Sequence, residues 1–184
     1  MQSGLILTAD PVAPLLEPWR SASVPAASAG GPAHVTALYP WDAAPVTEDA
    51  LRMLAETMSS EEPFSLILDR LERFPKGVLY LALDAPSEQR VRRLSARLVD
   101  TFPGCIPYEG EHQDPVPHLT VAFGDANALD RVEAEIWAAN RLHLPLVVQV
   151  TAVTVMEMTE GGTWVRAHEV PLGTASAPTL AEGG

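Results

Sequence analysis

A short pattern that occurs twice constrains the fold of this chain more than any other feature. The chain reads Pro-Ala-His-Val-Thr-Ala-Leu-Tyr at residues 32–39 and Pro-His-Leu-Thr-Val-Ala-Phe at residues 117–123. In an extended strand, residues two apart lie on the same face, so His34 shares a face with Thr36, and His118 with Thr120. Each copy therefore predicts a strand that presents one titratable ring beside one hydroxyl.

Length and composition indicate a single domain. The chain has 184 residues, of which 47% are hydrophobic, and this suffices for one core. We expect a two-lobed domain over residues 1–172, and a disordered tail over residues 173–184. The lone Cys105 excludes an internal disulfide and fits a reducing cytoplasm. No apolar run approaches a membrane span and the N-terminus lacks signal-peptide features, so we expect a cytoplasmic monomer without a membrane partner.

The net charge restricts the kind of partner. The chain carries 24 acidic and 12 basic residues, a net charge of −12, and a field of that sign repels a polyanion. We therefore expect a small phosphodiester or nucleotide substrate, or an RNA end, rather than a long nucleic acid tract. Four arginines crowd one predicted helix, where a solvated face is the more usual interpretation than an anion site. They are Arg90, Arg92, Arg93 and Arg97.

The hydrophobic pattern predicts an α+β chain. Strands are expected at residues 4–9, 64–71, 77–83, 116–123, 144–158 and 163–170, and helices at 47–58, 87–101 and 127–140. Thr47 should cap the first helix, Asp125 lies near the start of the third, and Trp137 should face inward. Residues 21–33, rich in Ser, Ala, Gly and Pro, are expected to form a mobile loop. A His-x-Thr strand, a helix and further strands occur twice in order, which hints at a structural duplication.

Two His-x-Thr strands can supply the groups that cleave a phosphodiester. In-line attack at phosphorus needs a base on the incoming oxygen and an acid on the leaving oxygen, and imidazoles with pKa values near 6.5 can provide both. Threonine hydroxyls can hydrogen-bond the non-bridging oxygens without adding positive charge. This scheme requires no metal, and the sequence offers no convincing metal-ligand spacing. A half-buried structural histidine is the usual interpretation of one such motif alone, and His112, His143 and His168 receive it.

The residues around both motifs resemble those of a known family. Four features carry this resemblance. The first motif ends in Leu38-Tyr39-Pro40 and the second opens with Pro117. The other two are the Trp19-Arg20 pair and the segment 73–81. The chain resembles the two-histidine (2H) phosphoesterase superfamily, and more specifically the bacterial 2′-5′ RNA ligase-like proteins.

That resemblance implies a fold, a chemistry and a set of site residues. It implies a bilobal α+β fold with pseudo-twofold symmetry, in which two antiparallel sheets line a central cleft and helices lie outside. It also implies metal-independent and cofactor-independent phosphodiesterase chemistry on 2′,3′-cyclic phosphates or 2′-5′ phosphodiesters. By carry-over, His34 and His118 form the acid–base pair, in an order left open, and Thr36 and Thr120 bind the phosphate.

Other residues near the motifs are weaker candidates. Trp41 and Phe74 lie on predicted loops and could stack on a base, although each could equally be a packing residue. Strand parity places Tyr39 on the face opposite His34, which favours the core. Arg20 and Lys76 could meet phosphate, but a surface role is the more usual one.

Three alternatives to hydrolysis remain open from the sequence. The first is 2′-5′ RNA ligation or RNA-end processing, which the net charge disfavours. The second is a nucleotide-binding module without turnover. The third is an inert domain in which the two rings point into separate cores.

Overall fold

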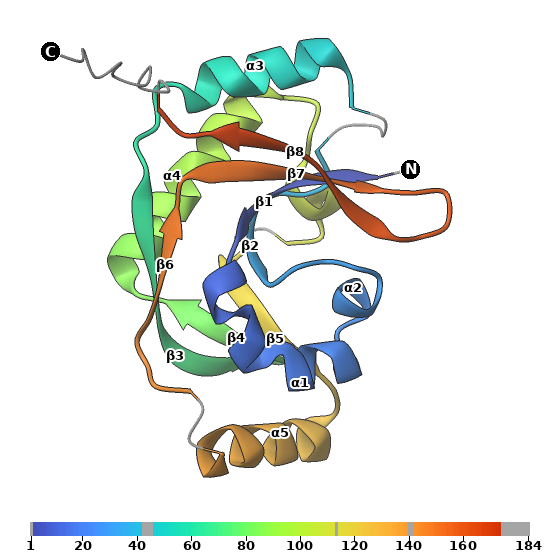
Figure 1. Ribbon diagram of the computed structural model, residues 1–184, viewed down its shortest axis with the longest axis vertical. Helices are drawn as coiled ribbons and strands as arrows, with labels where there is room; N and C mark the ends of the chain where they lie inside the picture. Colours follow the sequence, from blue (N-terminus) through green and yellow to red (C-terminus); the bar gives the residue numbers. More distant parts are fainter. Residues whose placement is uncertain (1, 42–45, 113, 140–141, 174–184) are drawn as a thin grey trace, which may run out of the picture.

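Two four-stranded antiparallel sheets form the framework of the molecule (Figure 1). The computed structural model describes residues 2–41, 46–112, 114–139 and 142–173. The strand order is β2-β1-β7-β8 in the first sheet and β5-β4-β3-β6 in the second. This arrangement confirms the predicted fold of two antiparallel sheets with helices around them.

The first sheet joins the two ends of the described chain. Its strands are β1 (Ser3–Thr8), β2 (His34–Leu38), β7 (Ala152–Met158) and β8 (Trp164–Pro171). The central strand β1 pairs with β2 on one side and with β7 on the other. Strands more than 100 residues apart in the sequence therefore share one sheet.

The second sheet is built from the middle of the chain. Its strands are β3 (Phe64–Phe74), β4 (Val78–Leu83), β5 (His118–Phe123) and β6 (Leu146–Val150). Strands β3 and β4 form a hairpin, and β5 adds to the β4 side of it.

The two His-x-Thr strands occupy equivalent places in the two sheets. Strand β2 is an edge strand of the first sheet, β5 is an edge strand of the second, and the two edges contact each other. His34 is the first residue of β2 and His118 the first residue of β5. The pseudo-twofold relation thus brings the two motifs together where the sheets meet.

Helices cover the framework, and local sequence accounts for where three of them begin. They are α3 (Glu48–Met58), α4 (Ala85–Thr101) and α5 (Ala126–Ala138). Thr47, Asp84 and Asp125 are the N-caps, and each side chain accepts a hydrogen bond from the backbone N–H three residues on. None of the described helices is long and apolar enough to cross a membrane.

The prediction of a mobile loop over residues 21–33 is wrong. Much of this segment belongs to two helices, α1 (Ala13–Ser23) and α2 (Pro25–Ser28), preceded by the 3₁₀ turn η1 (Asp10–Val12). Both helices have a proline in the first turn, where a missing N–H costs no intrahelical bond. Leu16 and Trp19 are buried in the core and hold α1 in place.

Two further expectations need correction. The predicted strand at 144–158 is two strands, because the chain passes at Thr151 from β6 in the second sheet to β7 in the first. Trp137 does not face inward: it is 50% exposed, since α5 buries only Leu129 and Ile136. Residue 140, the expected end of that helix, and residues 174–184 of the expected tail lie outside the described residues.

Candidate active site

One cavity of about 580 Å³ brings the four motif residues together. Its lining includes His34 and Thr36 from β2, and His118 and Thr120 from β5. We call this space the histidine cavity. The alternative in which the two rings point into separate cores does not agree with this placement.

Both imidazole rings are held in the same tautomer by a hydrogen bond to the backbone carbonyl two residues earlier. His34 Nδ1 lies 2.7 Å from the carbonyl oxygen of Pro32, and His118 Nδ1 lies 2.7 Å from that of Val116. A carbonyl oxygen can only accept, so Nδ1 carries the hydrogen in each ring. Each neutral ring therefore keeps an unprotonated Nε2 that can accept a proton, or donate one after protonation.

Burial favours the neutral form of both rings. Loss of solvent lowers the pKa of His34 to about 4, although its bond to the Pro32 carbonyl opposes the shift. The charges of Arg20 and of His118 lower the pKa of His34 further, so the two rings are close enough to influence each other. Burial also lowers the pKa of His118, and the nearby His112 adds to this effect.

Arg20, a weak candidate from the sequence for which a surface role was the more usual interpretation, is buried in the site. Its side chain is only 2% exposed and lines the histidine cavity. Its guanidinium donates to the backbone carbonyl of Thr120 and, at 3.0 Å, to that of Pro32, which also accepts from His34. Arg20 thus ties the segments that carry both motifs to α1. Only the Trp19-Arg20 match to the family could have signalled this from the sequence.

Two tyrosines complete the wall on the β2 side. Tyr39 lines the histidine cavity rather than the core, because β2 has a bulge: Leu38 pairs with Leu5 and Thr36 with Ile6, so the extra residue between them shifts the strand alternation before Tyr39. Tyr108, in the 3₁₀ turn η2 (Pro107–Gly110), also lines it, and its phenol lies near the hydroxyl of Thr36, which opposes the effect of burial on the pKa of Tyr108. Burial raises the pKa of Tyr108, so this phenol stays protonated.

The two residues predicted to stack on a base have packing roles. Trp41 is 3% exposed and packs edge-to-face on Phe102 with ring centroids 5.3 Å apart, so its faces are not available to a ligand. Phe74 stacks on Tyr80 at 4.0 Å and meets the His118 ring edge-to-face at 4.9 Å. Phe74 therefore supports His118 from the side, and neither aromatic lines the histidine cavity.

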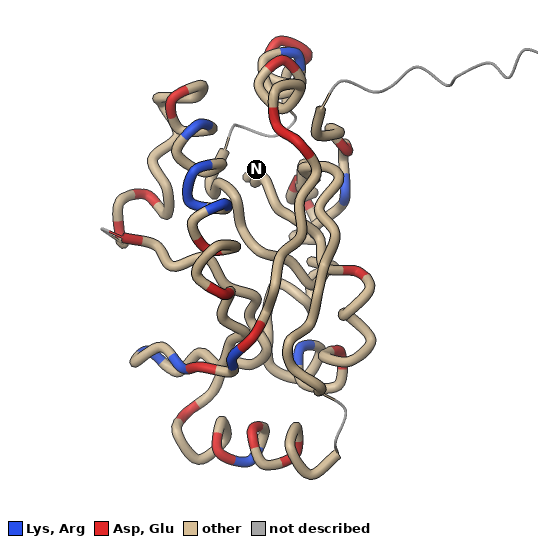
Figure 2. The backbone as a smooth tube through the Cα atoms, turned by 90° about the vertical axis from the view of Figure 1, so that its left-hand side faces the viewer, with Lys and Arg blue, Asp and Glu red and all other residues tan. Residues whose placement is uncertain are grey.

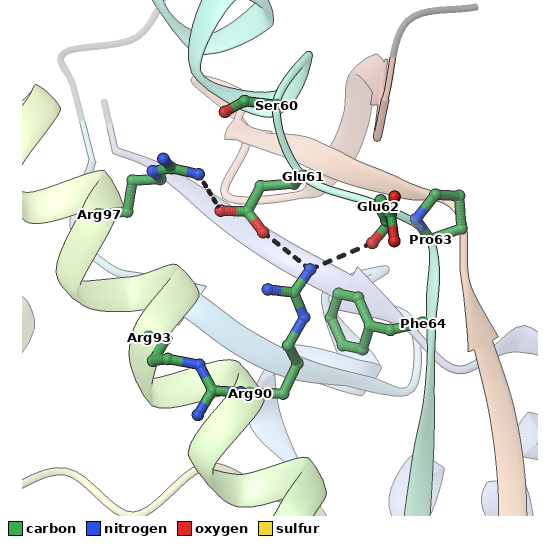
Figure 3. A pocket seen from close by; sticks show the side chains of 8 residues that line it. All are labelled: Ser60, Glu61, Glu62, Pro63, Phe64, Arg90, Arg93 and Arg97. Atoms are coloured by element: carbon green, nitrogen blue, oxygen red, sulfur yellow. Dashed lines mark hydrogen bonds and ion pairs between the residues drawn. The ribbon is translucent and has the colours of Figure 1, made fainter. Parts of the chain in front are cut away.

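The arginines of α4 face acidic partners rather than a free anion site. Figure 3 shows Glu61, whose side chain is 7% exposed, between Arg90 and Arg97, with an Arg90 N–O distance of 2.8 Å. Arg92 pairs with Glu88 and Asp114. In the described part of the chain, Arg93 alone of the four has no ion-pair partner. Acidic groups dominate elsewhere, as on α5 at the foot of Figure 2.

The remaining candidates lie outside the site. His112, His143, His168 and Lys76 are exposed. Within residues 2–41, 46–112, 114–139 and 142–173, no group of three or more His, Cys, Asp or Glu side chains is placed to hold a metal ion.

The family of the chain follows from its sequence profile. The family model described as the 2′-5′ RNA ligase superfamily matches residues 8–162, which include both motifs and Arg20. The chain belongs to the 2′-5′ RNA ligase superfamily. Its members are two-histidine phosphoesterases, which agrees with the resemblance drawn from the motifs. No curated protein matches the chain.

Solved structures share the fold at low sequence identity. TT0787 of Thermus thermophilus has a TM-score of 0.63 and 17% identity, and the match covers 96% of this chain and 100% of that one. E. coli LigT complexed with 3′-AMP has a TM-score of 0.59 and 15% identity, with 94% and 98% covered. E. coli LigT complexed with ATP has a TM-score of 0.56 and 17% identity over the same shares. At these identities, the likeness establishes the fold.

Proposed function

We propose that this protein is a phosphodiesterase that acts on 2′,3′-cyclic phosphates or 2′-5′ phosphodiesters of small nucleotides or RNA ends. One observation carries the proposal: two imidazoles with the same tautomer, each with a threonine two residues on, line one cavity. E. coli LigT, which shares the fold, has been crystallised with 3′-AMP, with ATP and with NADP+. The net charge of −12 supports a small substrate over a long polyanion.

The two rings divide the proton transfers of hydrolysis between them. A water oxygen bonds to phosphorus, one ring P–O bond of the cyclic phosphate breaks, and the product is a 2′- or 3′-phosphate monoester. One histidine Nε2 takes the proton from the water, and the other, protonated before attack, gives a proton to the released oxygen. The hydroxyls of Thr36 and Thr120 donate to the non-bridging oxygens as charge develops on them.

The electrostatics of the cavity favour His34 as the base. Arg20 and His118 both disfavour the protonated form of His34, whose pKa lies near 4. A base must be neutral before attack, and His34 meets this condition across the neutral range. His118 is then the acid, and the negative charge of a bound phosphate raises its pKa toward the range that this role needs.

A substrate panel tests the proposal directly. Wild type, His34→Ala and His118→Ala are incubated with 2′,3′-cyclic nucleotides, cyclic-phosphate-ended oligonucleotides and 2′-5′ dinucleotides, with chelator present, and the products are analysed by mass spectrometry. We expect turnover of at least one class by wild type and a loss of about a hundredfold or more in each variant. Turnover unaffected by both substitutions would refute the assignment. Binding without product in wild type would identify a nucleotide-binding module instead.

A further inference from the structure

A second, smaller cavity adjoins the histidine cavity. It has a volume of about 300 Å³ and lies between β2, one face of α4 and the residues 107–108 and 115–117. Thr36, Tyr39 and Tyr108 line both spaces. We call the smaller space the α4 compartment. A phosphate bound at the Thr36 hydroxyl would therefore stand at the junction of the two cavities.

The walls of the α4 compartment suit a flat, uncharged group. Ala96 and Val99 of α4 lie across from Val116 and from the prolines at 107, 115 and 117. Mostly apolar walls with a few polar groups are typical of sites for small organic ligands, and about 300 Å³ is within their usual range. Ser95 and Asp100 supply polar groups at the edge of this wall.

The charges around the α4 compartment argue against a second phosphate there. Arg92 is the one cation among the described residues that line it, and its guanidinium is already paired with Glu88 at 2.8 Å and with Asp114. Asp100 adds a carboxylate to the same lining. An anion would find no unpaired positive charge, whereas a neutral nucleoside meets no such obstacle.

The Tyr108 side chain lies between the two cavities, and its backbone conformation is well defined by its surroundings. Tyr108 and Glu109 have φ values of 50° and 54°, a left-handed conformation that non-glycine residues adopt only when their surroundings require it. The Tyr108 N–H donates to the Tyr39 carbonyl at 2.6 Å, and the two rings meet edge-to-face at 6.4 Å. Thr36 and Tyr108 line both cavities, so the threonine hydroxyl and the phenol lie together at the junction where a phosphate would bind. The left-handed turn thus places the Tyr108 ring at the junction of the two cavities.

We propose that the α4 compartment binds the second nucleoside of a substrate in which one phosphate joins two nucleosides, the first of which occupies the histidine cavity. This inference rests on the proposed function and narrows its substrate to a dinucleoside monophosphate or the last two nucleosides of an RNA end. In hydrolysis, water oxygen bonds to phosphorus and the bond from phosphorus to the oxygen of the second nucleoside breaks. That oxygen takes a proton from the imidazolium, which leaves a phosphate monoester on one nucleoside and a hydroxyl on the other.

Filling the compartment tests the inference. Ala96 is exposed on α4, so Ala96→Trp puts an indole into the space without disturbing the core. Ala134→Trp makes the same change at an exposed position of α5 that lines neither cavity. For each variant, kcat/KM is measured for 2′-5′-linked adenylyl-adenosine and for adenosine 2′,3′-cyclic monophosphate. Ala96→Met, which keeps a strong helix former, replaces the tryptophan variant if circular dichroism shows that it misfolds.

The ratio of the two kcat/KM values decides the outcome. One base contact contributes a factor of roughly 5 or more, so we expect Ala96→Trp to lower the dinucleoside-to-cyclic ratio at least fivefold, and Ala134→Trp to leave it within twofold. A smaller fall, or a wild type that cleaves only the cyclic mononucleotide, overturns the inference and leaves the proposed function standing.

A binding measurement separates the inference from the proposed function. Calorimetry on the His34→Ala/His118→Ala double variant gives the Kd for adenylyl-adenosine with and without Ala96→Trp. We expect this Kd to rise by about fivefold or more with the tryptophan, even if wild type turns over neither substrate and the proposed function fails. An unchanged Kd, or no binding, overturns the inference.

Discussion

Replacing Arg20 by methionine is expected to weaken both the fold and the site. The substitution keeps an unbranched side chain but removes the guanidinium that donates to the carbonyls of Thr120 and Pro32. Hydrogen bonds from a charged donor contribute about 1.5–3 kcal/mol each, so two account for about 3–6 kcal/mol. Burial lowers the pKa of Arg20, which means that its charge is destabilised where it lies, and losing it offsets part of this figure.

We expect a net loss of about 3 kcal/mol in the free energy of unfolding of Arg20→Met. For a chain of this length, 1 kcal/mol lowers Tm by about 2–4 °C, which predicts a fall of about 6–12 °C in differential scanning calorimetry. Arg131→Met, at an exposed position of α5, is the matched control and should change the stability by less than about 0.5 kcal/mol.

A second measurement reads the effect of Arg20 on its neighbour. The positive charge of Arg20 lowers the pKa of His34, so its removal raises that pKa. If His34 must be neutral for catalysis, the acidic limb of the kcat/KM profile moves to higher pH in Arg20→Met. A Tm within about 2 °C of wild type together with an unmoved acidic limb would refute the role assigned to this arginine.

Three further predictions concern acid stability, the Thr36 hydroxyl and the ion pairs of α4. The pKa of His34 falls from 6.5 in the unfolded chain to about 4 in the folded one, so the unfolded state binds the proton first as pH falls. Wild type should therefore lose about 2 kcal/mol more stability between pH 7 and pH 5 than His34→Gln, in urea titrations at both pH values. Tyr108→Phe removes the phenol that lies beside Thr36 at the junction of the two cavities and should lower kcat about 2- to 10-fold in steady-state assays, with the larger effect on kcat than on KM. Glu61→Gln removes the buried negative charge that pairs with Arg90 and Arg97, and should lower the free energy of unfolding by about 2 kcal/mol in urea denaturation. Glu62→Gln, at the exposed neighbouring position, should leave the free energy of unfolding almost unchanged. Equal stability of the two glutamine variants would contradict the role given to Glu61.

Local signals in the sequence predicted the helices α3, α4 and α5 and the two motif strands. Thr47 and Asp125 cap α3 and α5 as expected, because capping depends on the few residues around each helix start. His34 and His118 reach one cavity because the motif repeats at the same strand position in two equivalent sheets. Their roles in proton transfer remain proposals.

Features that depend on distant partners were not predictable from the sequence. The apolar run at 144–158 does not show that it contributes strands to two different sheets. This becomes visible only from the pairing of β6 with β3 and of β7 with β1. An arginine is normally a surface residue, and nothing near Arg20 in the sequence shows that its guanidinium donates to the carbonyls of Thr120 and Pro32. Proline and small residues at 21–33 are typical of loops, yet contacts with the core make α1 helical.

The position of β1 between β2 and β7 sets the order in which the site can be assembled during synthesis. The strand that carries His34 is completed early, but its sheet gains a third strand only once residues 152–158 have been made. Two strands alone are marginally stable in water. When synthesis has reached the end of β5, both histidines are present in the nascent chain, but the sheet that positions His34 is still incomplete. Such long-range pairing is slow to form, and the complete site should appear only after the last strands have docked.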